Sequence, residues 1–374
     1  MGLSKIDVAN MVENQMPQAN VADNVNFRNI IINGDMSVSQ RSTSASSITS
    51  SGYHALDRHR LAISSLGTWT ISQSTDVPTG QGFGKSMKFD CTTADASPSA
   101  SDVMWVQHRI EGQNLQYLKK GTSSAEKTTL SFWVKSNKTG TYIAELEDTD
   151  NSRHIAKSYT ISSSDTWEKK TITFDGDTTG TLTNDNNTSL ELHLYLGAGT
   201  NYTSGTLATS WASNTDANRA VGQVNLADST SNEWYVTGIQ LETGSQASDF
   251  EFLPVDINLE RCARYFILID TANSGSANTF VHNLGGVAGA SSVAFFPYEN
   301  FVPFRSAPSV SQSAVITVDE YFVANRTQSS TSIAMNAPSS KSGGVIKLSN
   351  FSSMTQGNGV QLSSGGTISL SAEL

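Results

Sequence analysis

Positive charge is scarce in this chain. Lysine and arginine together number 24 against 34 aspartate and glutamate, the formal net charge is −10, and charged residues make up only 16% of the 374 residues. No basic block occurs anywhere in the sequence. An acidic protein repels phosphate backbones, so nucleic-acid binding is disfavoured. The remainder is rich in Ser, Thr, Asn and Gly, which favours sheets and turns over long helices.

Long apolar runs are also missing. No stretch approaches the roughly 20 apolar residues of a membrane span, and the N-terminus has only Lys5 before a mixed polar run, unlike a secretory signal. We therefore expect that the chain is synthesised in a cytoplasm and does not insert into a membrane. Cys91 and Cys262 lie far apart, which favours free buried thiols over a disulfide between domains. The histidines show no metal-ligand spacing, so we expect structural histidines, no metal and no cofactor. They are His54, His59, His108, His154, His193 and His282.

Motifs of known catalytic sites are absent. There is no HExxH, GxSxG, Walker loop or CxxC in the sequence. The densest acidic cluster is Glu145, Glu147, Asp148 and Asp150, and a glycan-cleaving site needs two carboxylates about 5 to 9 Å apart. Because a hairpin turn is due at this point, we expect these acids to be solvated. A calcium loop is disfavoured because the EF-hand Gly and terminal Glu are missing. The chain is thus predicted not to be an enzyme.

Short strands separated by polar turns are the main pattern up to Leu241. Apolar segments of strand length, each bounded by Gly, Asn, Asp or Ser, predict about eight strands and an all-β fold, a jelly-roll β-sandwich over residues 27–255. The clearest expected strands are Gly67–Ser72, Ser86–Phe89, Val103–Ile110, Thr129–Val134, Thr141–Leu146, Thr171–Phe174, Leu190–Leu196 and Trp234–Leu241. A short strand is also expected at Ile30–Ile32, with Asn33-Gly34 as a turn into another strand from Met36. Trp105, Trp133 and Trp234 lie inside strands and are expected in the core.

A second, smaller β domain is expected over residues 256–374. It starts with a short helix that Asp256 could cap, with Leu259, Cys262, Ala263 and Phe266 on one face, followed by a buried strand from Tyr265 to Ile269. Its other strands are expected at Val293–Phe296, Ala314–Val318, Tyr321–Ala324, Gly344–Leu348 and Thr367–Leu370. Aromatic side chains in this unit could fill its own core or pack between chains of an oligomer. They are Phe295, Phe296, Tyr298, Phe301 and Phe304.

Three stretches resemble a known family. The segment GIQLETGSQASDFEF, followed by INLERCARYF, resembles the close of the β-sandwich module in many bacteriophage tail-fibre proteins. Asn29 to Arg41 is similar to the opening signature of that module, N-x-x-x-N-G-D-M-x-V-x-Q-R, and Asp57-Arg58 is similar to its D-R-W, with His59 in place of Trp. The resemblance implies a module like a carbohydrate-binding module in a virion appendage that assembles as a homotrimer.

The first 26 residues form a separate piece. Ser4 could cap a short helix that Pro17 ends, but about a dozen residues do not hold a helix alone in water. The start SKIDVANM is similar to the start of many phage fibres, which implies an anchor on phage tail or capsid proteins rather than a frayed end. The apolar side chains expected to dock are Ile6, Val8, Ala9, Val12 and Met16.

A long Gly-rich segment between Leu196 and Asn225 has no strand period and is a candidate for ligand binding. Sugars are recognised by flat aromatic faces together with amide and carboxylate groups. Tyr202 and Trp211, with Asn201, Asn214 and Asp216, offer that chemistry. The alternative is that Trp211 plugs the end of the sandwich, since large aromatic side chains are mostly buried.

The sequence thus predicts a virion protein that attaches by its N-terminus and binds a host-surface polysaccharide without covalent chemistry. A capsid-attached fibre or decoration protein and a polysaccharide depolymerase are the alternatives.

Overall fold

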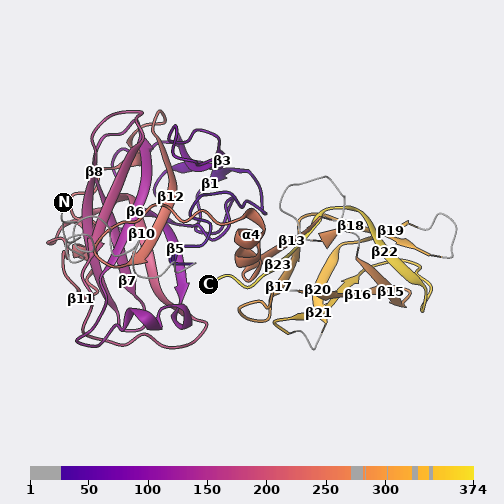
Figure 1. Cartoon of the computed structure of the whole chain (residues 1–374). Helices are drawn as coiled ribbons and strands as arrows, with labels where there is room; N and C mark the ends of the chain where they lie inside the picture. The colour runs from indigo at the N-terminus through magenta and orange to yellow at the C-terminus, as the bar shows by residue number, and fades with distance from the viewer. Residues whose placement is uncertain (1–26, 271–280, 283, 301, 322–326, 337–339) are drawn as a thin grey trace, which may run out of the picture.

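The computed structural model describes residues 27–270, 281–282, 284–300, 302–321, 327–336 and 340–374. The segment expected to anchor the chain, residues 1–26, lies outside the described residues, as do Phe301 and the expected strand residues after Tyr321. Figure 1 shows two β modules side by side, with a short helix, α4 (Val255–Ala263), at their junction. No helix among the described residues is long and apolar enough to cross a membrane.

The first module is a jelly-roll β-sandwich of two six-stranded sheets. Sheet A has the order β1-β3-β4-β12-β6-β9 and sheet B the order β11-β8-β7-β10-β5-β2. Consecutive strands β4 to β7 alternate between the two sheets, as a jelly roll requires. The bounds in sheet A are β1 Ser44–Ile48, β3 Thr68–Ser74, β4 Ser86–Thr93, β6 Thr128–Ser136, β9 Glu168–Phe174 and β12 Glu233–Thr243. Those in sheet B are β2 Arg60–Ser64, β5 Val103–Glu111, β7 Gly140–Asp148, β8 Arg153–Ile161, β10 Thr188–Ala198 and β11 Ala212–Ser213.

The core of this module lies between the two sheets. Alternate residues of each strand point inward, so that Trp69, Phe89, Phe132 and Trp234 are fully buried together with Leu194 and many other aliphatic side chains. Trp234 is therefore a core residue, as predicted. Trp105 and Trp133 are not, because each is only partly buried at the alternate, outward positions of β5 and β6.

Residues 28–39 form no strand, contrary to the prediction for Ile30–Ile32 and Met36. Two backbone hydrogen bonds join this segment to β12, from the Ile30 N–H to the carbonyl of Leu241 and from the Ile239 N–H to the carbonyl of Gly34, and side-chain amides add to them. Asn29 donates from Nδ2 to the carbonyl of Ile239 at 3.0 Å and accepts from the backbone N–H of Leu241 at 3.1 Å, so it clips the segment to β12. Asn33 has a φ of 61° and its side chain bonds the backbone of Val38 at both ends. A Cβ on Gly34 would lie 2.1 Å from the carbonyl oxygen of Ile239, so only glycine fits.

The second module has its own core between a four-stranded and a seven-stranded sheet. The four-stranded sheet has the order β14-β13-β23-β17, with β13 Phe266–Asp270, β14 Val281–His282, β17 Ser309–Gln312 and β23 Thr367–Ser371. The other has the order β19-β18-β22-β15-β16-β21-β20, with β15 Gly285–Ala290, β16 Val293–Glu299, β18 Ile316–Glu320, β19 Thr327–Ser330, β20 Ser332–Asn336, β21 Gly343–Ser349 and β22 Gly359–Gly365. Phe296 and Phe304 are fully buried in this core, whereas Phe295 and Tyr298 are partly buried.

Helix α4 begins two residues earlier than a cap at Asp256 would place it. Pro254 is the N-cap, its carbonyl accepts from the backbone N–H of Asn258 at 3.1 Å, and no side-chain cap is formed. Asp256 lies in the first turn, where a carboxylate still favours the positive end of the helix dipole. The predicted face is correct for Cys262 and Ala263, which are fully buried, while Phe266 already belongs to β13. Cys91 and Cys262 are both free and buried, as expected.

The two modules meet across a buried polar contact rather than a bare linker. Arg58, fully buried, pairs with Glu373 and donates to the carbonyl of Arg109 at 2.7 Å. Arg264 donates to both carboxylate oxygens of Glu111 at 2.7 Å. An Arg–carboxylate fork of this kind fixes orientation as well as distance. The α4 side of the second module is therefore held in a defined position against β5.

Candidate functional site

The outward face of sheet B carries an unusual row of polar and aromatic side chains. Residues of one strand that point to the same face are two positions apart. On this face β5 presents Trp105, Gln107 and Arg109, β7 presents Glu145 and Glu147, and β10 presents Glu191, His193 and Tyr195. His193 is paired in register with Gln107 on one side and with Glu145 on the other, which brings the three strands' polar groups together.

The segment between β10 and β12 lies over part of this face. It contains a short helix, α3 (Thr200–Thr203), and a 3-10 turn, η3 (Asp216–Asn218). Tyr202 and Leu207 pack against an apolar cluster of the sheet that includes Ile143 and Tyr195. The N–H of Ala220 donates to the carbonyl of Tyr202 at 2.9 Å, so the two ends of the segment hold each other. This anchoring directs the neighbouring Arg219 toward the polar row.

Glu145 is the centre of a buried network. Its side chain is fully buried, and its carboxylate contacts His154 Nδ1 at 2.8 Å, His193 Nδ1 at 2.9 Å and the hydroxyl of Tyr195, which donates at 2.9 Å. Arg219 donates to Glu145 from Nε at 3.0 Å and from Nη2 at 2.9 Å. A buried carboxylate is tolerated when it is paired and its lone pairs are satisfied, and this one meets both conditions.

The pKa values of Glu145 and His193 are shifted in the directions that keep both groups charged and so strengthen the network. Burial alone would raise the pKa of Glu145, but hydrogen bonds from His154 and His193 and the positive charge of Arg219 hold that pKa well below its ordinary value. Burial alone would lower the pKa of His193, but hydrogen bonds to Glu145 and Glu191 raise it to about 9. At neutral pH Glu145 is therefore ionised and His193 is protonated.

The same residues have the donor set of a cation site. One ligand atom each from Glu145, Glu147 and His193 lies within 4.8 Å of the others. Arg219 Nη2, however, lies 2.9 Å from Glu145 Oε2, 2.6 Å from Glu147 Oε2 and 3.2 Å from His193 Nδ1. The guanidinium thus occupies the centre of the donor set, and a protonated His193 offers no lone pair to a metal. These residues do not fit a metal ion.

The acidic cluster is not the solvated turn that we expected. Only Asp150 is exposed, in the turn between β7 and β8. Glu145 and Asp148 are fully buried, because the strand runs up to Asp148 and the carboxylate of that residue is paired with Lys120. The cluster is not a pair of catalytic carboxylates either, since Glu145 is enclosed by its own donors and has no surface for a substrate.

The network holds a partly exposed tryptophan in a fixed position. The ring of Trp105 lies 5.2 Å from that of His193 and 5.3 Å from that of Tyr195, and the Arg219 guanidinium carbon is 5.6 Å from its centre. The indole N–H is buried without a hydrogen-bond partner. Asp216, 66% exposed, lies 3.7 Å from Arg219 Nη1. We refer to Trp105, Tyr202, Asp216 and Arg219 as the sheet-face patch.

The structure brings together some of the candidate ligand residues and separates one. Tyr202 and Asp216 belong to the sheet-face patch, and Asn214 donates to Glu147 at 2.5 Å beside it. Asn201 is exposed next to Tyr202 on α3. Trp211 packs against the main core instead and donates its indole N–H to the carbonyl of Asp175 at 2.6 Å. Trp211 is partly buried against that core and directly precedes β11, the edge strand of sheet B.

Trp105, Arg219 and the buried histidines were missed as site residues. The signal for the strand residues was present, because Trp105, Gln107 and Arg109 alternate with Met104, Val106 and His108 along β5. No such signal existed for Arg219, which lies 74 residues from Glu145 in the chain. Of the six histidines, His193 has a carboxylate at each ring nitrogen, whereas His154 contacts Glu145 through Nδ1 and its Nε2 is buried without a hydrogen-bond partner.

Comparisons with known proteins give structural likeness alone. No family model and no curated protein matches the chain. Among solved structures, the enzymatically active domain of tailspike protein 4 of bacteriophage CBA120 is 12% identical with a TM-score of 0.31, and covers 58% of this chain and 22% of its own. A putative sugar binding protein from Bacteroides thetaiotaomicron is 14% identical with a TM-score of 0.31, covering 58% of this chain and all (100%) of its own. A CBM4 structure is 12% identical with a TM-score of 0.30, covering 57% and 99%. At these values the likenesses say nothing about this chain's site, and they leave its family open.

Proposed function

We propose that this chain is a non-catalytic glycan-binding protein of a bacteriophage appendage, and that the sheet-face patch is where it contacts the glycan. The observation that carries the binding proposal is Trp105, a partly exposed aromatic ring that is held by the rings of His193 and Tyr195 on the neighbouring strand and by the Arg219 guanidinium over it. Apolar faces of pyranose rings stack on such rings. A rigid ring binds with little loss of conformational entropy.

A polar group for sugar hydroxyls is offered by the covering segment. Asp216 is largely exposed there, and its carboxylate lies 3.7 Å from Arg219 Nη1. Tyr202, partly exposed, adds a second aromatic face on the covering segment. Glu145 and Glu147 beside the patch are both bound to Arg219, so Asp216 is left as its one largely exposed carboxylate, without the second carboxylate that glycan cleavage needs. Retention of a glycan without its cleavage is the expected behaviour.

The test is to incubate the purified chain with host envelope polysaccharide and to measure both retention and polymer size. Retention on immobilised polysaccharide without a fall in polymer size supports the proposal. Replacing Trp105 by alanine should weaken retention at least about tenfold, since stacking on one aromatic ring contributes roughly 1–2 kcal/mol or more. Trp133→Ala is the matched control, because this tryptophan is partly buried on the outward face of sheet A. A falling polymer size indicates a depolymerase, and equal losses in both variants contradict the assigned patch.

Attachment to a particle is the second part of the proposal. Its support is the resemblance of residues 1–26 and of the Asn29–Arg41 segment to phage fibres. Deleting residues 1–26 should give a folded protein that no longer joins virions. On particles that carry the full chain, a density map should locate the chain at the tail or at the capsid. A tail position supports a tail fibre; a capsid position supports the decoration alternative. Loss of folding on deletion contradicts an anchor role.

We also propose that the chain assembles as a homotrimer on the virion. The second module fills its own core with Phe296 and Phe304, so these residues are not available for contacts between chains. Val287, 43% exposed, and its cross-strand partner Phe295, partly exposed, remain on the outer face of β15 and β16. Sedimentation equilibrium of the purified chain measures the mass. A monomer at micromolar concentration contradicts the trimer.

A further inference from the structure

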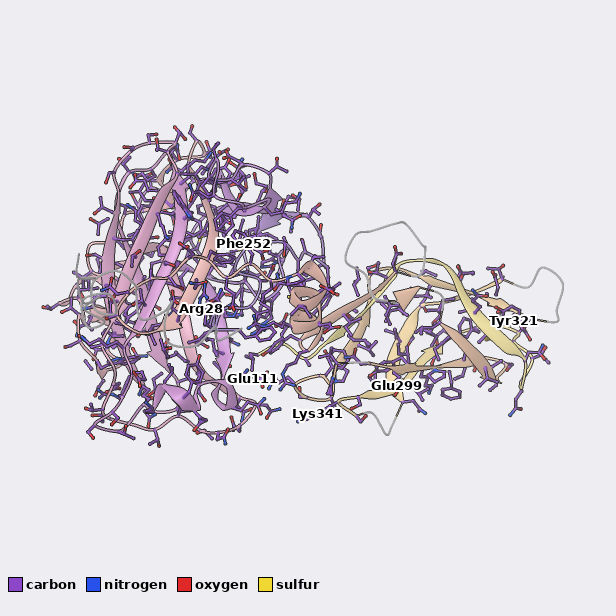
Figure 2. All side chains as sticks on the ribbon, in the orientation of Figure 1. Arg28, Glu111, Phe252, Glu299, Tyr321 and Lys341 are labelled. Carbon is purple, nitrogen blue, oxygen red and sulfur yellow. The ribbon has the colours of Figure 1, made fainter. Side chains whose placement is uncertain are left out.

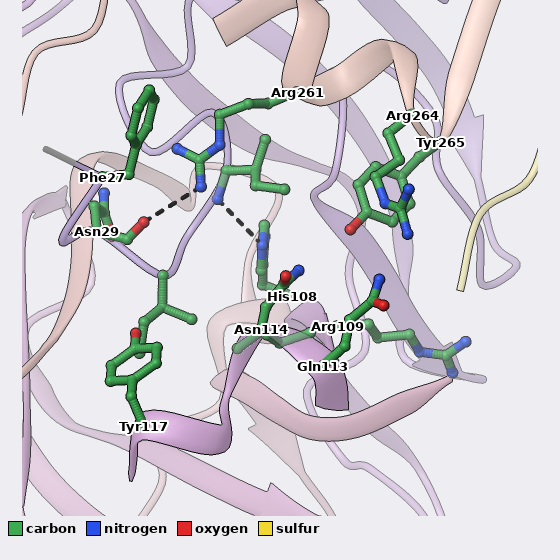
Figure 3. Close-up of a pocket in the computed structure, with 13 residues that line it drawn as sticks. Phe27, Asn29, His108, Arg109, Gln113, Asn114, Tyr117, Arg261, Arg264 and Tyr265 are labelled. Carbon is green, nitrogen blue, oxygen red and sulfur yellow. Dashed lines mark hydrogen bonds between the residues drawn. The ribbon is translucent and has the colours of Figure 1, made fainter. Parts of the chain in front are cut away.

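A second concave site lies at the junction of the two modules. It is a cleft of about 480 Å³ between the first module and helix α4. Figure 3 shows Arg261 and Arg264 reaching into it from the helix side, with Phe27, Tyr117 and His108 on the side of the first module. None of the residues of the sheet-face patch lines this cleft.

Positive charge dominates the cleft in a chain whose net charge is −10. Arg109, Arg261 and Arg264 line it, and no aspartate or glutamate does. Two of these arginines have carboxylate partners outside the lining: Arg109 lies 3.0 Å from Glu191, and Arg264 lies 2.7 Å from Glu111. A clustered, partly enclosed positive charge attracts an anion more strongly than the same charge on an open surface.

Arg261 differs from these two arginines because no carboxylate of the described residues lies at ion-pair distance from it, although the negative charge of Glu251 acts on it from farther away. It forms no ion pair with any described residue, and its one hydrogen bond is a 3.4 Å contact from Nη2 to the carbonyl of Asn29. Burial lowers the pKa of this guanidinium, which means that the charged form has lost part of its hydration. A planar fork of N–H donors with one weak partner matches the two oxygens of a carboxylate.

Two aromatic rings at the cleft are exposed to an unusual degree. Phe27 is 54% exposed and Tyr117 is 49% exposed, and both line the cleft. The side chain of Asn114 lines it next to them, on the 3-10 turn η1 (Gly112–Asn114). A site with a cationic fork, flat apolar rings and a side-chain amide has the groups that recognise a charged sugar ring: its carboxylate, its apolar face and its hydroxyls.

We propose that this junction cleft binds a carboxylate-bearing saccharide unit, with Arg261 holding the carboxylate and the rings of Phe27 and Tyr117 facing the sugar. The inference is independent of the sheet-face patch, because the two sites share no residue. It assigns the chain a preference for acidic over neutral polysaccharide. Such a unit could be part of a polymer or a free acidic sugar, and these two sources are separated by the test.

The test is calorimetric titration of the full chain with oligogalacturonate, with the same oligomer as its methyl ester, and with free galacturonate. The ester keeps the ring faces and hydroxyls but removes the charge. The acid oligomer should bind at least about tenfold more tightly than the ester. Free galacturonate with the affinity of the oligomer indicates a single-unit site, and weaker free sugar indicates a polymer site. Equal binding of acid and ester overturns the proposal, as does acetate binding as tightly as the sugar acids.

Variants assign the effect to the cleft. Arg261→Gln should abolish the preference for the acid, and Lys169→Gln is the control, since it removes one positive charge from an exposed residue of β9. Tyr117→Ala should weaken acid and ester by the same factor, because it removes ring contact and leaves the charge. Trp105→Ala should leave this titration unchanged, so failure of the sheet-face patch and failure of the cleft are distinguishable. If Arg261→Gln folds and still prefers the acid oligomer to the ester, the assignment is overturned. If Arg261→Gln does not fold, Tyr117→Ala decides, and unchanged affinities in that variant overturn the assignment.

Discussion

The guanidinium carbon of Arg58 lies 3.5 Å from the ring centre of Tyr265, so a side chain of the first module is stacked on a ring of the second. Tyr265 in turn donates its hydroxyl to Glu111 on β5 at 2.6 Å. Figure 2 shows Glu111 at the boundary between the modules. The stacked pair thus lies within a closed set of contacts that joins the modules.

Replacing Arg58 by methionine should lower the unfolding free energy by about 3 kcal/mol, because it leaves the buried Glu373 carboxylate with only one partner, Arg41. Urea unfolding followed by tryptophan fluorescence measures the change. The control is Arg28→Met, whose side chain is 32% exposed and 3.7 Å from Glu242, and which should cost at most about 1 kcal/mol. Equal losses in the two variants contradict a special role for Arg58.

Replacing Arg219 by methionine should cost about 3–5 kcal/mol, because Glu145 is then a buried carboxylate without its main cation. The same urea titration measures the loss. Lys138→Met is a suitable comparison, since its partner Asp228 and its own side chain are both 31% exposed. That change should cost at most about 1 kcal/mol. A small loss in Arg219→Met is incompatible with the network described here.

Stability should depend on pH with a maximum between about pH 5 and 6.5. The pKa of Glu145 is depressed, so its contribution is present above the ordinary value of about 4.3 and is lost as pH falls through the folded value. The pKa of His193 is raised to about 9, so its contribution is present below about 6.5 and is lost as pH rises from there through about 9.

Urea midpoints at steps from pH 4 to pH 10 measure this profile. His193→Gln should remove most of the alkaline decline, while His54→Gln should keep it, because the pKa of His54 is lowered by burial and that residue titrates on the acid side. An identical alkaline slope in both variants shows that another group is responsible.

Replacing Gly34 by alanine should lower the unfolding free energy by about 2 kcal/mol or more, because the new Cβ would lie 2.1 Å from a backbone oxygen that β12 holds in place. Gly84→Ala is the matched control, since a Cβ there meets no atom within 4 Å and its φ is not in the left-handed region. That variant should be neutral or stabilised by a few tenths of a kcal/mol. Thermal unfolding of both variants measures the difference in stability, and equal melting temperatures contradict the prediction.

Much of the first module could be read from the sequence, because its strands follow a period of two between polar turns. The expected strands Val103–Ile110 and Trp234–Leu241 lie within β5 and β12. The prediction of a strand was wrong at Ile30–Ile32, where two backbone bonds to β12 are supplemented by side-chain bonds from Asn29 and Asn33. The sequence pattern also missed β15 and β22, whose glycines and serines look like spacers in the sequence.

The candidate site was only half predictable, for a physical reason. Tyr202 and Asp216 were identified by residue type in a long loop, which is a local property. Glu145 was assigned to solvent because most acids are exposed, yet its partners His193 and Arg219 lie 48 and 74 residues away. Charge compensation over such separations leaves no local pattern. A structure is needed to show it.

The contact between Arg58 and Glu373 spans 315 positions of the chain. On the ribosome, the guanidinium of Arg58 emerges long before the carboxylate that neutralises it. Until residue 373 is synthesised, the nascent first module carries an unmatched positive charge on the surface that the second module will cover. Closure of this surface by the second module is therefore a late step, because the contact with Arg58 needs Glu373.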